Sequence, residues 1–187
     1  MEDKSKLTSE ESLEIITSMI QITKGSVKNM SFHFLLWGWV VAIGNLGHYY
    51  LMEYTTYDYP FAIWLITVPT WFVSFIYGYK QSTRARVRTY SSELLMWTWL
   101  AFSFSIAIFI FSGKFGELIS PSILLFAGTA TFLTGLIIRF KPLIYGGSSF
   151  WIFATIGFIV SPAHSLLLSA VAVFIGYLIP GYLLKKS

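Results

Sequence analysis

The sequence contains no cysteine among its 187 residues. This absence excludes disulfide bonds, thiolate nucleophiles and cysteine-based metal sites. Two catalytic patterns are missing as well: there is no His-Glu-x-x-His zinc motif and no Gly-x-Ser-x-Gly nucleophile elbow. We therefore predict that the protein is not an enzyme, and that it has no catalytic residue, no cofactor and no bound metal.

Charged residues are also scarce. They make up 12% of the chain, whereas apolar residues make up 55% and aromatic residues 19%. Soluble domains contain about 25% charged residues, so this composition indicates a membrane protein. Six apolar segments of about 18 to 21 residues match a hydrocarbon core of about 30 Å. These expected spans are residues 32–52, 60–79, 94–112, 119–138, 143–160 and 166–184. The predicted fold class is an all-α, polytopic bundle of six transmembrane helices.

The spans themselves contain no Asp, Glu, Lys or Arg between their ends. Ionisable residues inside a membrane usually mark an ion pathway or a proton relay. Their absence argues against transport that is coupled to ions through a buried acid. The formal net charge of +4 does not indicate a nucleic-acid partner, because the basic residues lie between the apolar segments.

The N-terminal arm, residues 1–30, is polar and lacks the pattern of a secretory signal. Thr8 followed by Glu11 forms a capping box, and apolar residues then recur at helical spacing. We predict a cytoplasmic amphipathic helix over residues 9–24 that ends at Gly25. We favour a helix that lies on the membrane surface or packs under the bundle. The alternative is a helix that binds a membrane or cytoplasmic protein partner. Residues 31–187 form the predicted transmembrane domain.

Basic residues alternate between the loops and so predict the topology. Twelve of the 13 lie at the N-terminus, in alternate loops and at the C-terminus: Lys4, Lys6, Lys24, Lys28, Lys80, Arg84, Arg86, Arg88, Arg139, Lys141, Lys185 and Lys186. Lys114 alone lies on the other side. Because basic loops stay in the cytoplasm, we predict that both termini are cytoplasmic, with the bacterial inner membrane as the expected location.

The loop after the second span carries four cations and no acid. The need to orient the chain in the membrane already accounts for this charge. The loop is also a candidate site for contact with anionic lipid head groups, and each cation would contribute about 1 kcal/mol to that binding. The candidate contact residues are Lys80, Arg84, Arg86 and Arg88.

Three polar residues lie near the outer end of the first span, and His164 is expected at the same depth. Asn45, His48, Tyr49 and His164 are therefore the candidate residues of a polar pocket open to the outside. A shared metal or haem on His48 and His164 is the sharper alternative. The simpler interpretation, which we favour, is interfacial and interhelical hydrogen bonding.

Small residues four apart predict which helices approach closely. Such pairs are Gly38 with Ala42, Thr131 with Gly135, and Ala172 with Gly176, so the first, fourth and sixth spans are expected in the tight part of the bundle. We interpret Gly146-Gly147-Ser148-Ser149 as a flexible or kinked helix start. Pro69 predicts a kink in the second span.

No motif indicates a family. The leading hypothesis is a non-enzymatic scaffold, accessory or regulatory membrane protein, which acts through its helix surfaces and its N-terminal helix, with a homo-oligomer as a further alternative. The second hypothesis is a transporter or channel for an uncharged small solute or lipid, with Asn45, Tyr49 and the Pro69 break along its path.

Overall fold

The computed structural model describes the backbone of residues 9–84, 90–113 and 116–186, and their side chains except at 9–29 and 82–84. All regular secondary structure in these ranges is helical, which confirms the predicted all-α class. The elements are α1 (Ser9–Tyr54), η1 (Pro60–Ile66), α2 (Thr67–Arg84), α3 (Tyr90–Phe111), η2 (Gly116–Leu118), α4 (Ile119–Ile137), α5 (Lys141–Gly157), α6 (Pro162–Val173), η3 (Phe174–Leu178) and α7 (Ile179–Lys186). A π-helical turn, η3, joins α6 and α7 into one helical segment.

Five helical segments are long and apolar enough to cross a bilayer. They are Met30–Tyr54, Pro60–Gln81, Tyr90–Phe111, Gly116–Ile137 and Pro162–Lys186, with 22 to 25 residues each. They match the first four predicted spans and the sixth. The remaining helix, α5, has 17 residues, or about 25 Å at about 1.5 Å per residue.

Helix α5 ends before the predicted end of the fifth span, residue 160. It stops at Gly157, and the chain turns toward α6. Ser161 is extended, with ψ at 155°, because the ring of Pro162 disfavours the helical conformation in the residue before it. Pro162 therefore fixes where α6 begins, and residues 158–161 separate it from the end of α5 at Gly157.

Helix α1 is continuous over 46 residues. Its first described residue is Ser9, and the capping residue Thr8 lies outside the described residues, so the predicted cap stays a prediction; the predicted end at Gly25 is wrong. A glycine inside a helix costs only about 1 kcal/mol, and no proline follows before the apolar span begins at Met30. The side chains of residues 9–24 lie outside the described residues, so their amphipathic character stays a prediction.

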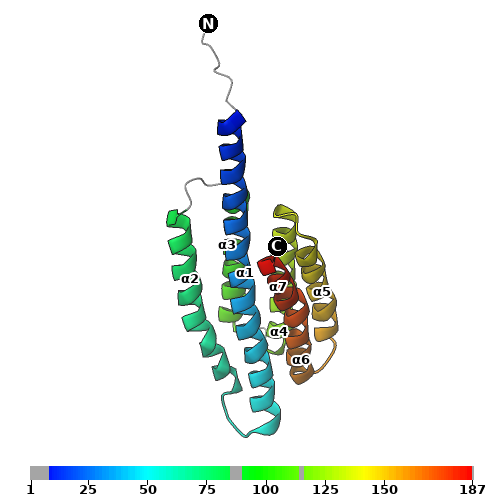
Figure 1. Ribbon diagram of the computed structural model, residues 1–187. Helices are drawn as coiled ribbons and strands as arrows, with labels where there is room; N and C mark the ends of the chain where they lie inside the picture. Colours follow the sequence, from blue (N-terminus) through cyan, green and yellow to red (C-terminus); the bar gives the residue numbers. More distant parts are fainter. Residues whose placement is uncertain (1–8, 85–89, 114–115, 187) are drawn as a thin grey trace.

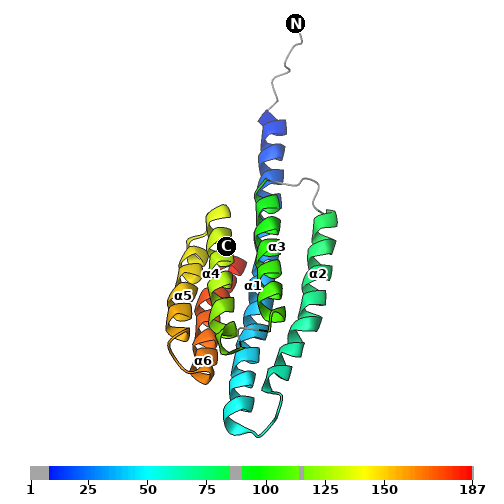
Figure 2. The ribbon, with the colours of Figure 1, turned by 180° about the vertical axis from the view of Figure 1, so that it is seen from behind.

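The other helices lie on different sides of α1 (Figure 1). Helices α4, α5, α6 and α7 pack together on one side, and α2 lies on the other. Helix α3 lies behind α1 in Figure 1 and in front of it in Figure 2, and it packs against α4. The N-terminal turns of α1 project beyond the other helices.

The two ends of the bundle differ in charge. The end of α2, the α4–α5 connection and the C-terminus lie at the end from which the N-terminal part of α1 projects (Figure 1). The basic residues whose side chains are described belong to these segments: Lys80, Arg139, Lys141, Lys185 and Lys186. The opposite segments carry Glu53, Asp58 and Glu117, while Glu93 at the start of α3 is an acid at the basic end.

A tight turn joins α4 to α5. Arg139 has a positive φ of 55°, and its N–H donates to the carbonyl of Leu136 at 3.2 Å. The N–H of Phe140 donates to the carbonyl of Gly135 at 2.9 Å. These two bonds form a Schellman motif, which ends α4 and reverses the chain. Helices α4 and α5 are consequently packed along one another (Figure 1).

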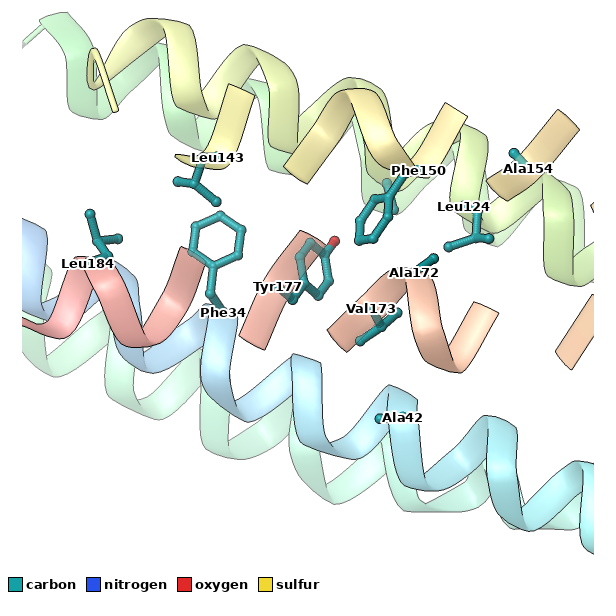
Figure 3. Packing of buried hydrophobic residues seen from close by; sticks show 11 residues of the cluster. Phe34, Ala42, Leu124, Leu143, Phe150, Ala154, Ala172, Val173, Tyr177 and Leu184 are labelled. Carbon is teal, nitrogen blue, oxygen red and sulfur yellow. The ribbon is translucent and has the colours of Figure 1, made fainter. Parts of the chain in front are cut away.

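The core lies between α1, α4, α5 and the α6–α7 segment (Figure 3). Phe150 of α5 is fully buried, and its ring lies 5.0 Å from that of Tyr177. The Tyr177 ring also meets Phe34 of α1 at 5.4 Å. Three helical segments therefore meet around one aromatic cluster of Phe34, Phe150 and Tyr177.

Glycines bring the backbones of α4, α5 and η3 together. A Cβ atom at Gly147 would lie 2.5 Å from the backbone nitrogen of Phe132, and one at Gly146 would lie 2.8 Å from the carbonyl oxygen of Gly176. The interpretation of Gly146 and Gly147 as a flexible helix start is wrong, because both lie inside α5 and are buried. Close approach through small residues is the usual way that helices associate in lipid.

Candidate functional site

Helices α2 and α3 are almost without buried residues. None of the residues from Tyr90 to Phe111, all of which the structure describes, is buried. Thr70 is the one buried residue between Thr67 and Gln81, the part of α2 whose side chains are described. The large exposed apolar side chains of the two helices include Val68, Trp71, Phe72, Phe75, Ile76, Met96, Trp97, Phe104 and Ile108. The two helices thus leave long apolar faces free of contact within the chain.

At its basic end, α2 is joined to α1 by a polar contact. His33 Nδ1 and Ser74 Oγ are hydrogen-bonded at 2.8 Å, and Trp37 Nε1 donates to the same Ser74 oxygen at 3.3 Å. The rings of Phe32 and Tyr77 stack beside this pair, with centroids 4.0 Å apart. This cluster was not predicted from the sequence, because His33 carries no motif and Ser74 and Tyr77 come from another helix, α2.

At the other end, η1 packs closely on α1. Gly44 and Gly47 leave room for Trp64 and Ile63: a Cβ atom at Gly44 would lie 3.0 Å from the Trp64 ring, and one at Gly47 3.1 Å from the Ile63 side chain. The indole of Trp64 donates to His48 Nδ1 at 3.1 Å. Helix α2 and η1 are therefore fixed to α1 at both ends.

Helix α3 is held by aromatic rings. Trp99 lies 5.9 Å from Phe34 of α1, and Phe109 lies 6.0 Å from Phe126 of α4. Within the described residues, α2 and α3 make little or no contact with each other.

The candidate polar-pocket residues have separate partners. Asn45 is buried, and its amide donates to the Val41 carbonyl of the same helix at 2.9 Å. His48 accepts from Trp64, and Tyr49 contacts the ring of Tyr54 at 6.1 Å. His164 is exposed and pairs with Ser161 at 2.6 Å. Among the described residues, no hydrogen bond joins any two of the four.

The described part of the chain gives no support to a metal site of three or more ligands. It contains no group of three or more His, Asp or Glu side chains that could hold a metal ion. The predicted lack of a metal, a cofactor and catalytic residues stays a prediction.

The basic loop is described only in part. Lys80 is exposed on α2, whereas the side chain of Arg84 and the whole of Arg86 and Arg88 lie outside the described residues. Their contact with lipid head groups stays a prediction.

A cleft of about 160 Å³ lies between α1, α2 and α7 at the basic end. Its lining residues are Ser31, Phe32, Leu35, Tyr77 and Lys185. From the sequence, Lys185 indicated only the topology, because no feature of the sequence predicts that it lies beside residues of the first span.

Comparisons with protein-family models, curated proteins and solved structures find no match to this chain.

Proposed function

We propose that this protein is an integral membrane protein that crosses the bacterial inner membrane six times, with both termini in the cytoplasm. Five segments have the necessary length and hydropathy. Helix α5 is shorter, but it packs along α4, and a short span is accommodated by local thinning of the bilayer. The basic residues collected at one end of the bundle support cytoplasmic termini.

Within that membrane, the protein acts as a non-enzymatic scaffold or accessory subunit that binds a transmembrane segment of another protein along α2 and α3. The observation that carries this proposal is the near absence of buried residues on these two helices. Helices α4 to α7, by contrast, bury residues along their length.

The chemistry of the exposed faces fits such a partner. Trp71 and Phe72 of α2, and Trp97 and Phe104 of α3, are exposed. Aromatic side chains supply large contact areas and are enriched in protein interfaces. Because lipid tails are as apolar as a partner helix, selection of the partner must come from the fit of these rings and from hydrogen bonds. The partner is therefore expected to present small residues between the rings.

The packing of the interior favours this role over a transporter or channel. Gly147 and Gly128 hold α5 and α4 in backbone contact. Within the described residues, Ser165 Oγ is the one fully buried side-chain oxygen or nitrogen without a hydrogen-bond partner. Of the residues assigned to a transport path, Asn45 bonds its own helix, and Pro69 lies exposed in the first turn of α2.

Photo-crosslinking in native membranes tests the proposal. Benzoylphenylalanine is placed at Phe72 or at Phe104, which are 65% and 67% exposed, and at Ile152 of α5 as a control that is 63% exposed. The three side chains are thus matched in exposure and differ in the helix that carries them. We expect the same membrane protein in the adducts from both aromatic positions and its absence at the control position.

A co-purification measurement completes this test. The double variant Phe72→Ala with Phe104→Ala is expected to lower recovery of that partner at least tenfold, while Ile152→Ala leaves recovery unchanged. A product of twice the chain mass would identify a second copy as the partner. Adducts with lipid alone, or equal protein adducts at all three positions, would contradict the proposal.

A further inference from the structure

We infer that the cleft between α1, α2 and α7 binds the head group of an anionic phospholipid, with an acyl chain along an exposed stripe of α1. The site lies in the leaflet next to the two chain termini, which is the cytoplasmic leaflet in the proposed orientation. It does not depend on whether a protein partner binds α2 and α3.

The cleft offers a positive charge to a phospholipid head group. The ammonium-bearing side chain of Lys185 lines it, together with Tyr77 and with Ser31, which is 2% exposed. None of its lining residues is acidic. Glu93, the acid at this end whose side chain is described, belongs to α3, which lies on the other side of α1 (Figure 2). Charge therefore favours a phosphodiester in this cleft.

The walls of the cleft are apolar and firmly placed. Phe32 is stacked on Tyr77 at 4.0 Å, which joins α1 to α2. Leu35 lies against α7, because a Cβ atom added to Gly181 of α7 would be 3.0 Å from the Leu35 side chain. The cleft is thus bounded by contacts that join α1 to α2 and α1 to α7.

An exposed stripe on α1 continues from the cleft toward the other end of the bundle. Leu35 lines the cleft, and Trp39, Ile43 and Leu46 follow at intervals of three or four residues, so they share one face of the helix. These three are 46%, 50% and 50% exposed. Trp39 is fixed by donating to the Tyr182 hydroxyl of α7 at 3.2 Å. An acyl chain attached to a head group at Lys185 can therefore lie along this stripe.

Free phosphate shares the head-group chemistry but lacks the acyl chain. Lipid binding uses both the cation and the α1 stripe, whereas phosphate binding uses the cation alone. The experiment must therefore vary the head group and the chain separately.

Native mass spectrometry of the full chain, released from detergent with added lipid, tests this inference. The probes are phosphatidylglycerol, phosphatidylcholine and inorganic phosphate. We expect one phosphatidylglycerol to be retained by the native chain in preference to phosphatidylcholine. Lys185→Gln should weaken its binding about fivefold, the effect of losing about 1 kcal/mol from one cation. Lys186→Gln removes the same charge from the adjacent residue outside the cleft and should leave binding nearly unchanged.

A second variant tests the acyl-chain contact. Trp39→Ala retains Lys185 but removes the largest side chain of the stripe, and it should also weaken phosphatidylglycerol binding. Equal binding of phosphatidylglycerol and phosphatidylcholine would overturn the inference. So would equal losses in the two lysine variants, or displacement of bound phosphatidylglycerol by an equal concentration of inorganic phosphate.

Discussion

Replacing Gly147 with leucine is expected to unfold the helix bundle or to prevent its assembly. Even a Cβ atom at this position would lie 2.5 Å from the backbone nitrogen of Phe132 and 2.7 Å from its Cα atom. These are backbone atoms of α4, so no side-chain rotation relieves the clash. Helix α4 would have to move away from α5, with an expected loss of about 3 kcal/mol or more in the free energy of unfolding.

The measurement is unfolding in detergent, followed by far-ultraviolet circular dichroism and by size-exclusion chromatography. Gly78→Leu is the matched control, because a Cβ atom at Gly78 on α2 has no neighbour within 4 Å. Leucine is also a better helix former than glycine by about 0.8 kcal/mol, so this control should be neutral or slightly stabilising. Equal losses in the two variants would contradict the described packing of α4 on α5.

Phe150→Ala is expected to lower the free energy of unfolding by about 3 kcal/mol. Phe150 has no exposed surface, and its ring packs directly against Gly176. A Cβ atom added to Gly176 would lie 2.3 Å from that ring. Truncation removes the contact with Tyr177 and leaves a cavity that rigid helix backbones cannot close.

The control for this variant is Phe104→Ala. Phe104 is 67% exposed on α3, so its truncation in purified protein should change the free energy of unfolding by less than about 0.5 kcal/mol. Both variants lose the same atoms, so their difference measures burial alone. Similar losses for the two would show that α3 is packed as closely as α5.

Sequence reasoning located most of the helices because length and apolar composition are strong signals. Small-residue spacing placed the first, fourth and sixth spans in the tight part of the bundle, but it left out α5, which packs along α4. In a bilayer, a side chain that faces lipid and one that faces another helix are both apolar, so hydropathy identifies both α3 and α4 as spans without showing which of them is packed. Glycine spacing is the remaining signal: Gly135 and Gly176 were correctly assigned to close contacts, whereas Gly146 and Gly147 were not.

The surfaces proposed here were predictable only in part. His33 and Ser74 lie 41 residues apart, and Lys185 lines the same cleft as Phe32 only because α7 returns to the start of the first span. Contacts of this kind depend on how the helices are ordered around α1, which basic residues in loops do not specify. The polar residues near the end of the first span were noticed because they interrupt an apolar run, yet Asn45 bonds within its own helix.

The central claim is that the chain crosses the membrane six times, and labelling of single cysteines tests it most directly. The native chain has no cysteine, so Asp58→Cys, Lys141→Cys, Ser161→Cys and Lys186→Cys each introduce one reactive thiol. With a membrane-impermeant maleimide on intact cells, positions 58 and 161 should react, and positions 141 and 186 should react only after permeabilisation. Reaction of positions 141 and 161 from the same side would show that α5 does not cross and would contradict the account.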